Sequence, residues 1–126
     1  MNTASGIAIL LWASEPEAPH RLATPFFHAA AAAALDVPVE IYFTARSVRL
    51  LQPGVARALH AAAHEKSIYD AMREAAAHGA VFYACTDALQ ANGLGATVLI
   101  PECTRRGGAV QFMARASDLS WRTLVF

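Results

Sequence analysis

Five short apolar runs are spaced along the chain, and segments of helix-forming composition lie between them. Runs of this length that are rich in branched and aromatic residues predict β-strands. Strands that alternate with helices through short connections are typical of α/β folds with a parallel sheet. The pattern therefore predicts a three-layer α/β sandwich around a mostly parallel sheet of about five strands. The predicted strands are residues 7–12, 39–43, 80–84, 96–100 and 121–126.

Capping residues set the expected boundaries of the helices. The first helix falls within residues 19–35, with Thr24 as its N-cap and Pro25 at its first helical position, where proline loses no hydrogen bond. Ser67 is expected to cap a second helix, which Gly79 ends. Further helical segments are predicted at residues 55–64, 86–92 and 109–118.

The chain has 126 residues, a length that fits one domain spanning residues 1–126. Hydrophobic residues make up 56% of the chain. The mean hydropathy is +0.32, a high value for a soluble domain of this size. More apolar surface is therefore available than one small core can bury. We expect a homo-oligomer whose subunits share an apolar face.

Charge and hydropathy exclude several classes of partner. Ten basic residues balance ten acidic ones, so we expect neither nucleic acid nor a membrane surface as a partner. No uninterrupted run of eighteen apolar residues occurs, which argues against a transmembrane helix. The first residues lack the basic and apolar regions of a signal peptide, so a cytoplasmic location is expected. In that reducing compartment the two cysteines are expected to be free thiols.

Cys85 lies where the third apolar run ends and a helical pattern begins, with Thr86 or Asp87 as the expected N-cap. A thiol at the junction of a buried strand and a helix N-terminus is near unpaired backbone N–H groups and the positive end of the helix dipole, which favour its thiolate. Such a sulfur can act as a nucleophile or a sulfur carrier. The alternative is that Cys85 is a small apolar residue that closes the strand, since unpaired cysteines are among the most buried residues.

The loops after the first three predicted strands carry further polar groups. Because the carboxyl ends of parallel strands meet at one edge of a sheet, these loops are expected to converge around Cys85. Arg46 would then provide the counter-charge for a thiolate or persulfide. The same residue types are common in ordinary turns and caps, so a purely structural role stays open. The predicted binding residues are Ser14, Thr44, Arg46, Thr86 and Asp87.

Cys103 lies in a polar stretch, residues 101–108, that is expected to be a loop. Arg105 and Arg106 would lower the pKa of its thiol if they pointed at it, so Cys103 could act as a relay for the sulfur on Cys85. The alternative is an incidental cysteine at the surface or in an interface.

No metal or cofactor is expected. His60 and His64 are four residues apart and could share a helix face, but a zinc site needs three or four ligands and no other histidine has a suitable spacing. The first strand is not followed by a glycine-rich fingerprint, which argues against classical dinucleotide binding. The G-x-S-x-G pattern of serine hydrolases is also missing.

The order of the elements and the sequence around Cys85 resemble the DsrE/DsrF-like family of small α/β proteins. The resemblance covers most of the chain and is carried by VEIYFT at 39–44, FYACTDALQANG at 82–93 and the helix and strand at 108–126. It implies a protein of the sulfur relays of bacterial sulfur oxidation and tRNA thiolation, with Cys85 at the position of the cysteine that accepts a persulfide. It also implies a trimer or hexamer and partner proteins that donate and accept sulfur. Residues 95–108 depart from the family pattern, which leaves Cys103 without an assured counterpart.

Three hypotheses follow for the function. The favoured one is a sulfur carrier or sulfurtransferase that accepts persulfide sulfur on Cys85. The second is a non-catalytic oligomeric module that binds a small ligand or a nucleotide in a pocket at the edge of the sheet. The third is a purely structural or regulatory oligomer, without thiol reactivity or a ligand.

Overall fold

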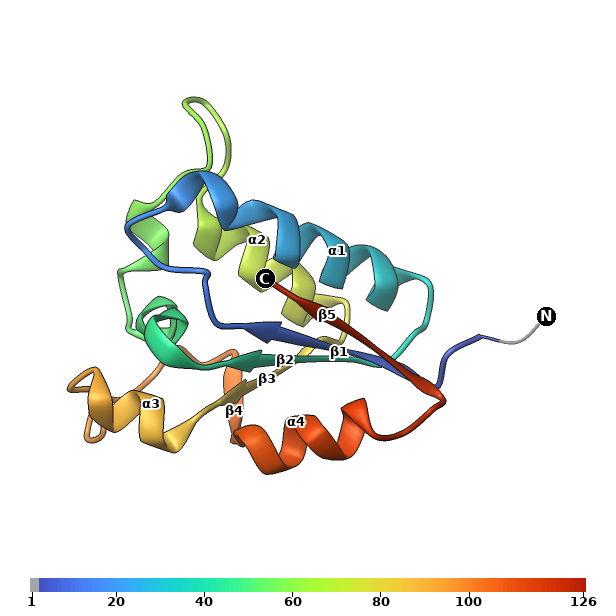
Figure 1. The fold of residues 1–126 in the computed structure, drawn as a ribbon. Coiled ribbons are helices and arrows are strands. Elements are labelled where there is room, and N and C mark those ends of the chain that lie inside the picture. Colours follow the sequence, from blue (N-terminus) through green and yellow to red (C-terminus); the bar gives the residue numbers. More distant parts are fainter. Residues whose placement is uncertain (1–2) are drawn as a thin grey trace.

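The computed structural model describes residues 3–126 and contains a five-stranded sheet in which all neighbouring strands are parallel (Figure 1). The strand order is β4-β3-β2-β1-β5, so β4 and β5 are the edge strands. This arrangement confirms the predicted α/β sandwich. The strands are β1 (Gly6–Leu11), β2 (Val39–Phe43), β3 (Val81–Ala84), β4 (Cys103–Arg106) and β5 (Trp121–Val125).

Helices cover the two faces of the sheet unequally. α1 (Ala23–Ala34) and α2 (Ile68–Ala77) pack together over one face, whereas α4 (Ala109–Ala116) lies over the other (Figure 1). The short α3 (Thr86–Ala91) extends from the carboxyl end of β3. Within residues 3–126, no helix is long and apolar enough to cross a bilayer. Three 3₁₀ segments, Pro19–Arg21, Ala45–Leu51 and Ala56–Ala58, lie in the connections.

The main hydrophobic core lies between the sheet and the layer of α1 and α2. Phe26 of α1 packs against Phe43 and Phe82, with ring centroids 6.1 and 6.3 Å away, and all three rings are fully buried. Burying a side chain of this size contributes about 1.5–3 kcal/mol. The opposite face has a much smaller core, centred on Tyr42 and Phe112. Fewer apolar contacts therefore hold α4 than hold α1 and α2.

A buried ion pair connects α4 to the sheet across this small core. Glu40 of β2 is the one buried charged residue in the described part of the chain. The Nε and Nη2 atoms of Arg115 donate to its two carboxylate oxygens, each at 2.9 Å. The Tyr42 hydroxyl donates to the same carboxylate at 2.6 Å. The Arg115 guanidinium also lies 4.1 Å from the centroid of the Trp121 ring. These contacts fix α4 to both β2 and β5.

The ion pair lowers the pKa of the Glu40 carboxyl. Burial acts to raise the pKa of Glu40, but hydrogen bonds from Arg115 and Tyr42 outweigh it and hold this pKa below its ordinary value of 4.5. A carboxyl whose pKa is lower in the folded than in the unfolded protein stabilises the fold above the unfolded pKa. This contribution is lost as the pH falls through the folded-state pKa. Burial and the neighbouring carboxylate also raise the pKa of Tyr42, so its hydroxyl stays a donor.

Both predicted boundaries of α2 are confirmed. The Ser67 Oγ accepts a hydrogen bond from the backbone N–H of Asp70 at 3.1 Å, as an N-cap side chain does. The helix ends just before Gly79, which has a φ of 114° that residues with a Cβ atom rarely adopt.

The predicted start of α1 is wrong by a fraction of a turn. Leu22, not Thr24, is the N-cap, and it provides no side-chain hydrogen bond. Pro25 is the third helical residue, which is tolerated because the N–H groups of the first turn have no partner within the helix. Residues 55–64 are also less helical than predicted, since they contain only the 3₁₀ turn Ala56–Ala58.

The fourth strand is not where the apolar pattern predicted it. Residues 96–100 form no strand, although the last two of them are buried in the core. β4 instead runs through the polar stretch that was expected to be a loop, where Cys103 pairs with Phe82. An edge strand with mostly exposed residues shows no apolar run in the sequence. Pro101, which has no N–H to donate, separates the buried run from β4.

Replacing Arg115 with alanine leaves the Glu40 carboxylate buried without its partner. We expect Arg115→Ala to lower the free energy of unfolding at neutral pH by about 3 kcal/mol, the lower end of the range for a broken buried pair. Urea unfolding measures this effect. The difference in free energy of unfolding between the wild type and the variant should become smaller as the pH falls below about 4.5. Protonation removes the charge of Glu40, and a neutral carboxyl is destabilised less by the absence of Arg115.

The exposed Arg122 of β5 provides the matched control for this experiment. Arg122→Ala should change the free energy of unfolding by no more than about 0.5 kcal/mol. An Arg115→Ala effect as small as that of the control would contradict the anchoring role of the ion pair.

Candidate functional site

The register of the sheet determines which residues face α4 beyond the strand ends. Leu10, Tyr42 and Tyr83 pair across β1, β2 and β3, and all three belong to the small core beneath α4. Because side chains alternate along a strand, the residues two positions later face the same side. On β2 and β3 these residues are Thr44 and Cys85. Cys85 therefore lies at the carboxyl edge of the sheet, on the side of α4.

Backbone hydrogen bonds continue across the strand ends. They keep the segments that follow β2, β3 and β4 at the spacing of the sheet, so the site has an ordered base outside the regular strands. The N–H of Thr44 donates to the carbonyl of Leu11 at 3.1 Å, that of Cys85 to Phe43 at 3.0 Å, and that of Gly107 to Ala84 at 3.1 Å.

A cavity of about 270 Å³ opens beside the Cys85 thiol. The start of α4 and the ends of β1 and β2 form its walls, and no charged side chain lines it. Its polar side-chain atoms belong to Tyr42, Thr44 and Cys85. The apolar lining residues are Leu10, Phe43, Ala109, Phe112 and Met113. We call this space the Cys85 cavity.

Two glycines let the turn between β4 and α4 approach the thiol closely. A Cβ atom on Gly108 would lie 3.3 Å from the Cys85 Sγ, and one on Gly107 would lie 2.9 Å from the Tyr83 ring. Gly108 is also the N-cap of α4, and no side chain caps this helix. The first backbone N–H groups of α4 have no partner within the helix. These N–H groups therefore begin at Gly108, the glycine that approaches the Cys85 sulfur.

Cys85 is half-buried and is a free cysteine. It is itself the N-cap of α3, so the prediction that Thr86 or Asp87 caps this helix is wrong: these are its first two helical residues. Both are exposed, and neither lines the Cys85 cavity. The structure thus places these two predicted binding residues next to the thiol in sequence but outside its cavity.

Ser14 and Arg46 lie away from the thiol. Ser14 is buried in the wall of another cavity, which Phe126 also lines. Arg46 forms ion pairs with Glu15, at 3.4 Å, and with Glu17. Neither residue lines the Cys85 cavity, so the guanidinium that was expected to balance a thiolate is engaged by carboxylates elsewhere.

The Cys103 side chain lies on the face of the sheet opposite α4, against the main core. It pairs with Phe82, whose ring is buried in the core beneath α1. The Cys103 Sγ lies 3.9 Å from Arg106 Nη1, but burial outweighs this guanidinium and raises the pKa of the Cys103 thiol above its usual 9.0. Arg106 thus acts on this pKa in the predicted direction, but the burial that outweighs it leaves no sign in the sequence. Cys103 pairs with Phe82, three residues before Cys85, so at about 3.3 Å per residue the two cysteines are separated by roughly 10 Å along the strands. Cys103 is therefore not positioned as a relay for Cys85.

His60 and His64 do not share a helix face, because no helix forms over these residues. His60 Nδ1 lies 2.9 Å from the backbone carbonyl oxygen of Glu65, and His64 adopts a φ of 70° in a turn. Throughout residues 3–126, no three His, Cys, Asp or Glu side chains are grouped so that they could hold a metal ion.

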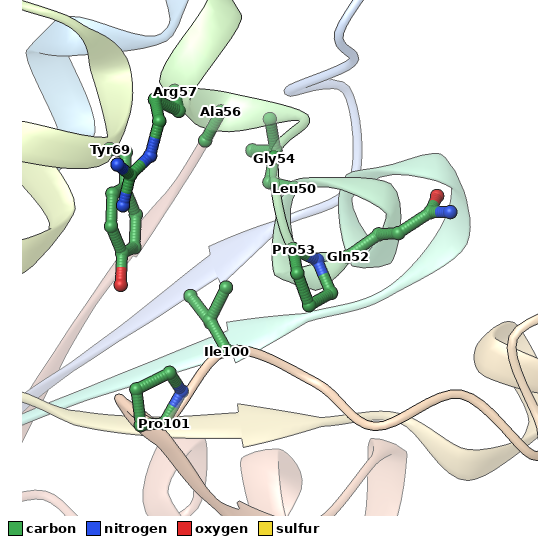
Figure 2. A pocket seen from close by; sticks show the side chains of 9 residues that line it. All are labelled: Leu50, Gln52, Pro53, Gly54, Ala56, Arg57, Tyr69, Ile100 and Pro101. Carbon is green, nitrogen blue, oxygen red and sulfur yellow. The ribbon is translucent and has the colours of Figure 1, made fainter.

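A second cavity, of about 200 Å³, lies near the start of α2 (Figure 2). The Arg57 guanidinium lies 5.2 Å from the centroid of the Tyr69 ring, and Ile100 and Pro101 complete the wall below them in Figure 2. The residues that line this cavity provide no thiol, carboxylate or imidazole. It offers a stacking surface but lacks the groups that nucleophilic or acid–base chemistry requires.

Sequence reasoning missed the residues that α4 contributes to the Cys85 cavity. In the sequence Phe112 and Met113 are ordinary apolar positions of an amphipathic helix. The one available signal is the pair Gly107 and Gly108 before that helix, because adjacent glycines permit close backbone approach. Of the predicted binding residues, Thr44 is the one that lines the cavity.

Comparison with known proteins agrees with this architecture. Residues 7–126 match the model of the DsrE/DsrF-like family. The crystal structure of the ychN protein from E. coli is similar with a TM-score of 0.76 and 15% identity, over 100% of both chains. The protein of unknown function MTH1491 from Methanobacterium thermoautotrophicum is similar with a TM-score of 0.65 and 15% identity, over 95% of this chain and 97% of that one. At such identities the likeness shows the fold alone, and no curated protein matches the chain significantly.

Two single-cysteine variants separate the reactivities of the thiols. Cys103→Ser retains Cys85 in its cavity, and Cys85→Ser retains Cys103 with its raised pKa. We expect the thiol of Cys103→Ser, which is Cys85, to react with iodoacetamide several-fold faster at neutral pH than the thiol of Cys85→Ser, which is Cys103. The thiolate is the reacting form, and burial disfavours the thiolate of Cys103. Alkylation followed over time by mass spectrometry measures both rates. A faster reaction at Cys103 would contradict this assignment.

Proposed function

The chain belongs to the DsrE/DsrF-like family, and from this premise we propose that it is a sulfur carrier that accepts persulfide sulfur on Cys85. The observation that carries the proposal is the position of a free thiol in the wall of a cavity at the carboxyl edge of a parallel sheet. Ligands of open α/β sheets bind at this edge. The opening beside the sulfur provides room for an incoming sulfur compound.

The proposed reaction is an exchange of sulfane sulfur between thiols. The Cys85 thiolate attacks the terminal sulfur of a persulfide R–S–SH, which forms a new S–S bond on Cys85 and breaks the S–S bond of the donor. The electron pair of the broken bond leaves with R–S⁻, which then takes up a proton from water. A thiolate of an acceptor next attacks the outer sulfur, and Cys85 returns to the thiolate. Neither half needs an external oxidant or reductant.

The surroundings of Cys85 support this role in three ways. Cys103 pairs with Phe82, three residues before Cys85, so it is not placed to attack the inner sulfur of a Cys85 persulfide, which would close a disulfide and release the outer sulfur as hydrosulfide. Gly108 provides a backbone surface without a side chain beside the Sγ atom. The first N–H groups of α4, which follow the N-cap Gly108, have no partner within the helix and are thus available as donors to a negatively charged sulfur.

Binding of a nucleotide, the alternative use of this edge, has less support from the same residues. Phosphates are bound by Lys or Arg side chains or by glycine-rich loops at helix N-termini. The Cys85 cavity contains no Lys or Arg, and 270 Å³ is below the usual range of ligand pockets, roughly 300–1,000 Å³.

We further propose that the chain works as a homo-oligomer, with separate proteins as sulfur donor and acceptor. Exposed apolar residues flank the Cys85 cavity. Val125 of β5, which is 56% exposed, pairs with the cavity residue Leu10, and Val110 of α4 is 88% exposed. Exposed apolar residues beside a cavity are typical of a surface that another subunit covers.

Persulfide loading tests the carrier role directly. After incubation with a low-molecular-weight persulfide, the protein should gain about 32 Da, one sulfur atom, on the peptide that contains Cys85. The adduct should persist in Cys103→Ser and disappear in Cys85→Ser. Mass spectrometry of the intact protein and of its peptides measures both. An adduct that Cys85→Ser retains would show that another group accepts the sulfur.

A matched pair of glycine variants tests the space around the sulfur. In Gly108→Ala the new Cβ atom lies 3.3 Å from the Cys85 Sγ, and in Gly95→Ala it lies 3.3 Å from the Gln90 Cγ, away from the cavity. Gly108→Ala should slow loading about tenfold, because overpacking costs typically 1–3 kcal/mol. Gly95→Ala should load at the wild-type rate.

Sedimentation equilibrium tests the proposed assembly. We expect a mass that is a multiple of the 13.4 kDa chain. Val125→Asp should lower the degree of association, because it places a charge in the apolar patch beside the cavity. Val98→Asp provides the control, since Val98 is also exposed but lies in residues 96–100, outside this patch. A wild-type protein that sediments as a single chain at micromolar concentrations would overturn the proposal.

A further inference from the structure

We infer that the Cys85 cavity binds the organic group R of the persulfide, and that it selects small, uncharged, apolar groups. This inference rests on the proposed function and adds the class of substrate to it. Besides a donor protein, the chain would accept sulfur from a hydropersulfide R–S–SH of low molecular weight, in which R is a hydrocarbon group about the size of one ring. Cys85 would take the terminal sulfur while R occupies the cavity and leaves as the thiol R–SH.

The chemistry of the lining carries the inference. Leu10, Phe43, Phe112 and Met113 present only hydrocarbon or thioether surface to the cavity. The hydroxyl of Tyr42, one of the few polar groups there, already donates to the Glu40 carboxylate at 2.6 Å, outside the apolar lining. A charged group on R would lose its hydration without gaining a partner, which is strongly unfavourable.

No arginine side chain lines the cavity, although Arg105 and Arg106 at the end of β4 directly precede the lining residue Gly107. Arg115 donates both ends of its guanidinium fork to Glu40. Arg46 forms its ion pairs with Glu15 and Glu17. Neither guanidinium lines the cavity. A carboxylate on R would therefore meet no free cation there.

The volume of the cavity limits the size of R. An apolar cavity of roughly 150 Å³ admits a benzene molecule, and the Cys85 cavity has about 270 Å³. A benzyl group fits this space, whereas a peptide with several charged groups exceeds it.

The walls are held in place before any substrate arrives. Phe112 packs edge-on against Tyr42, with ring centroids 5.5 Å apart, and Tyr42 stacks on Tyr83 at 4.7 Å. Met113 is 54% exposed, so it lies at the rim between the cavity and solvent. A flexible thioether at this position can adjust to different hydrocarbon groups.

Two donors that differ by a single carboxylate group test the selectivity. Benzyl hydropersulfide and its 4-carboxybenzyl derivative have the same ring and leaving sulfur, and the carboxylate is far from the reacting atoms. We expect Cys85 to load from the benzyl compound at least about tenfold faster, because the cavity excludes the carboxylate. The same two donors are also reacted with N-acetylcysteine, a thiol without a cavity. The ratio of these two rates gives the intrinsic difference in reactivity between the donors.

Variants at the rim connect the selectivity to the cavity. Met113→Lys places a cation at the rim that can pair with the carboxylate of the 4-carboxybenzyl donor, so it should bring the ratio for the two donors towards that of N-acetylcysteine. Ala116→Lys places the same charge one turn later on α4, on an exposed residue outside the cavity, and should retain the wild-type ratio. Sedimentation of both variants checks that their state of association matches.

The possible outcomes distinguish the two proposals. If Cys85 loads from both donors with the ratio of N-acetylcysteine, the inferred substrate class is overturned while the carrier role stands. If Cys85 loads from neither donor, the carrier role fails for small persulfides, and the inferred substrate class fails with it.

Discussion

The ion pair between Glu40 and Arg115 is the interaction on which the candidate site depends. The core beneath α4 is small, and apolar contacts alone allow a helix to shift over a sheet. Two parallel hydrogen bonds of 2.9 Å to one carboxylate restrict the helix to a single position. A buried pair adds little net stability, but any other position of α4 would leave both charges unpaired. Phe112 and Met113 are carried by the same helix, so the ion pair also sets the position of one wall of the Cys85 cavity.

Tyr42 links the polar anchor to the apolar cavity. Its hydroxyl is bound to Glu40, and its ring lies in the cavity wall against Phe112. The hydrogen bond removes a polar group from the cavity without removing the aromatic surface. Tyr42 therefore both binds the Glu40 carboxylate and lines the cavity, because its place on β2 is between Glu40 and the end of the strand. Thr44, which directly follows this strand, brings the second hydroxyl to the cavity.

The sequence was sufficient to predict the elements that have strong local signals. Residues 39–43 are an apolar run long enough for a strand only, and Ser67 has the side chain and spacing of an N-cap. Cys85 could be placed at the end of a strand, because an apolar run precedes it at residues 80–84 and a helical pattern follows it at residues 86–92. β4 could not be predicted, since an exposed edge strand depends on pairing with β3 rather than on its own pattern. The pairing of Arg46 with Glu17 and the burial of Cys103 likewise depend on contacts between segments distant in sequence.

The two edges of the sheet differ in a way that limits how copies of the chain can join. β4 presents the exposed Arg105 and Arg106, and its register with β3 is irregular between Phe82 and Tyr83. Charges and irregularities of this kind keep foreign strands from adding to an edge. Fibril growth by continuous addition of sheets requires each molecule to present two receptive edges. This chain has such an edge at most on the side of β5, so association of folded copies through strand pairing ends after two molecules.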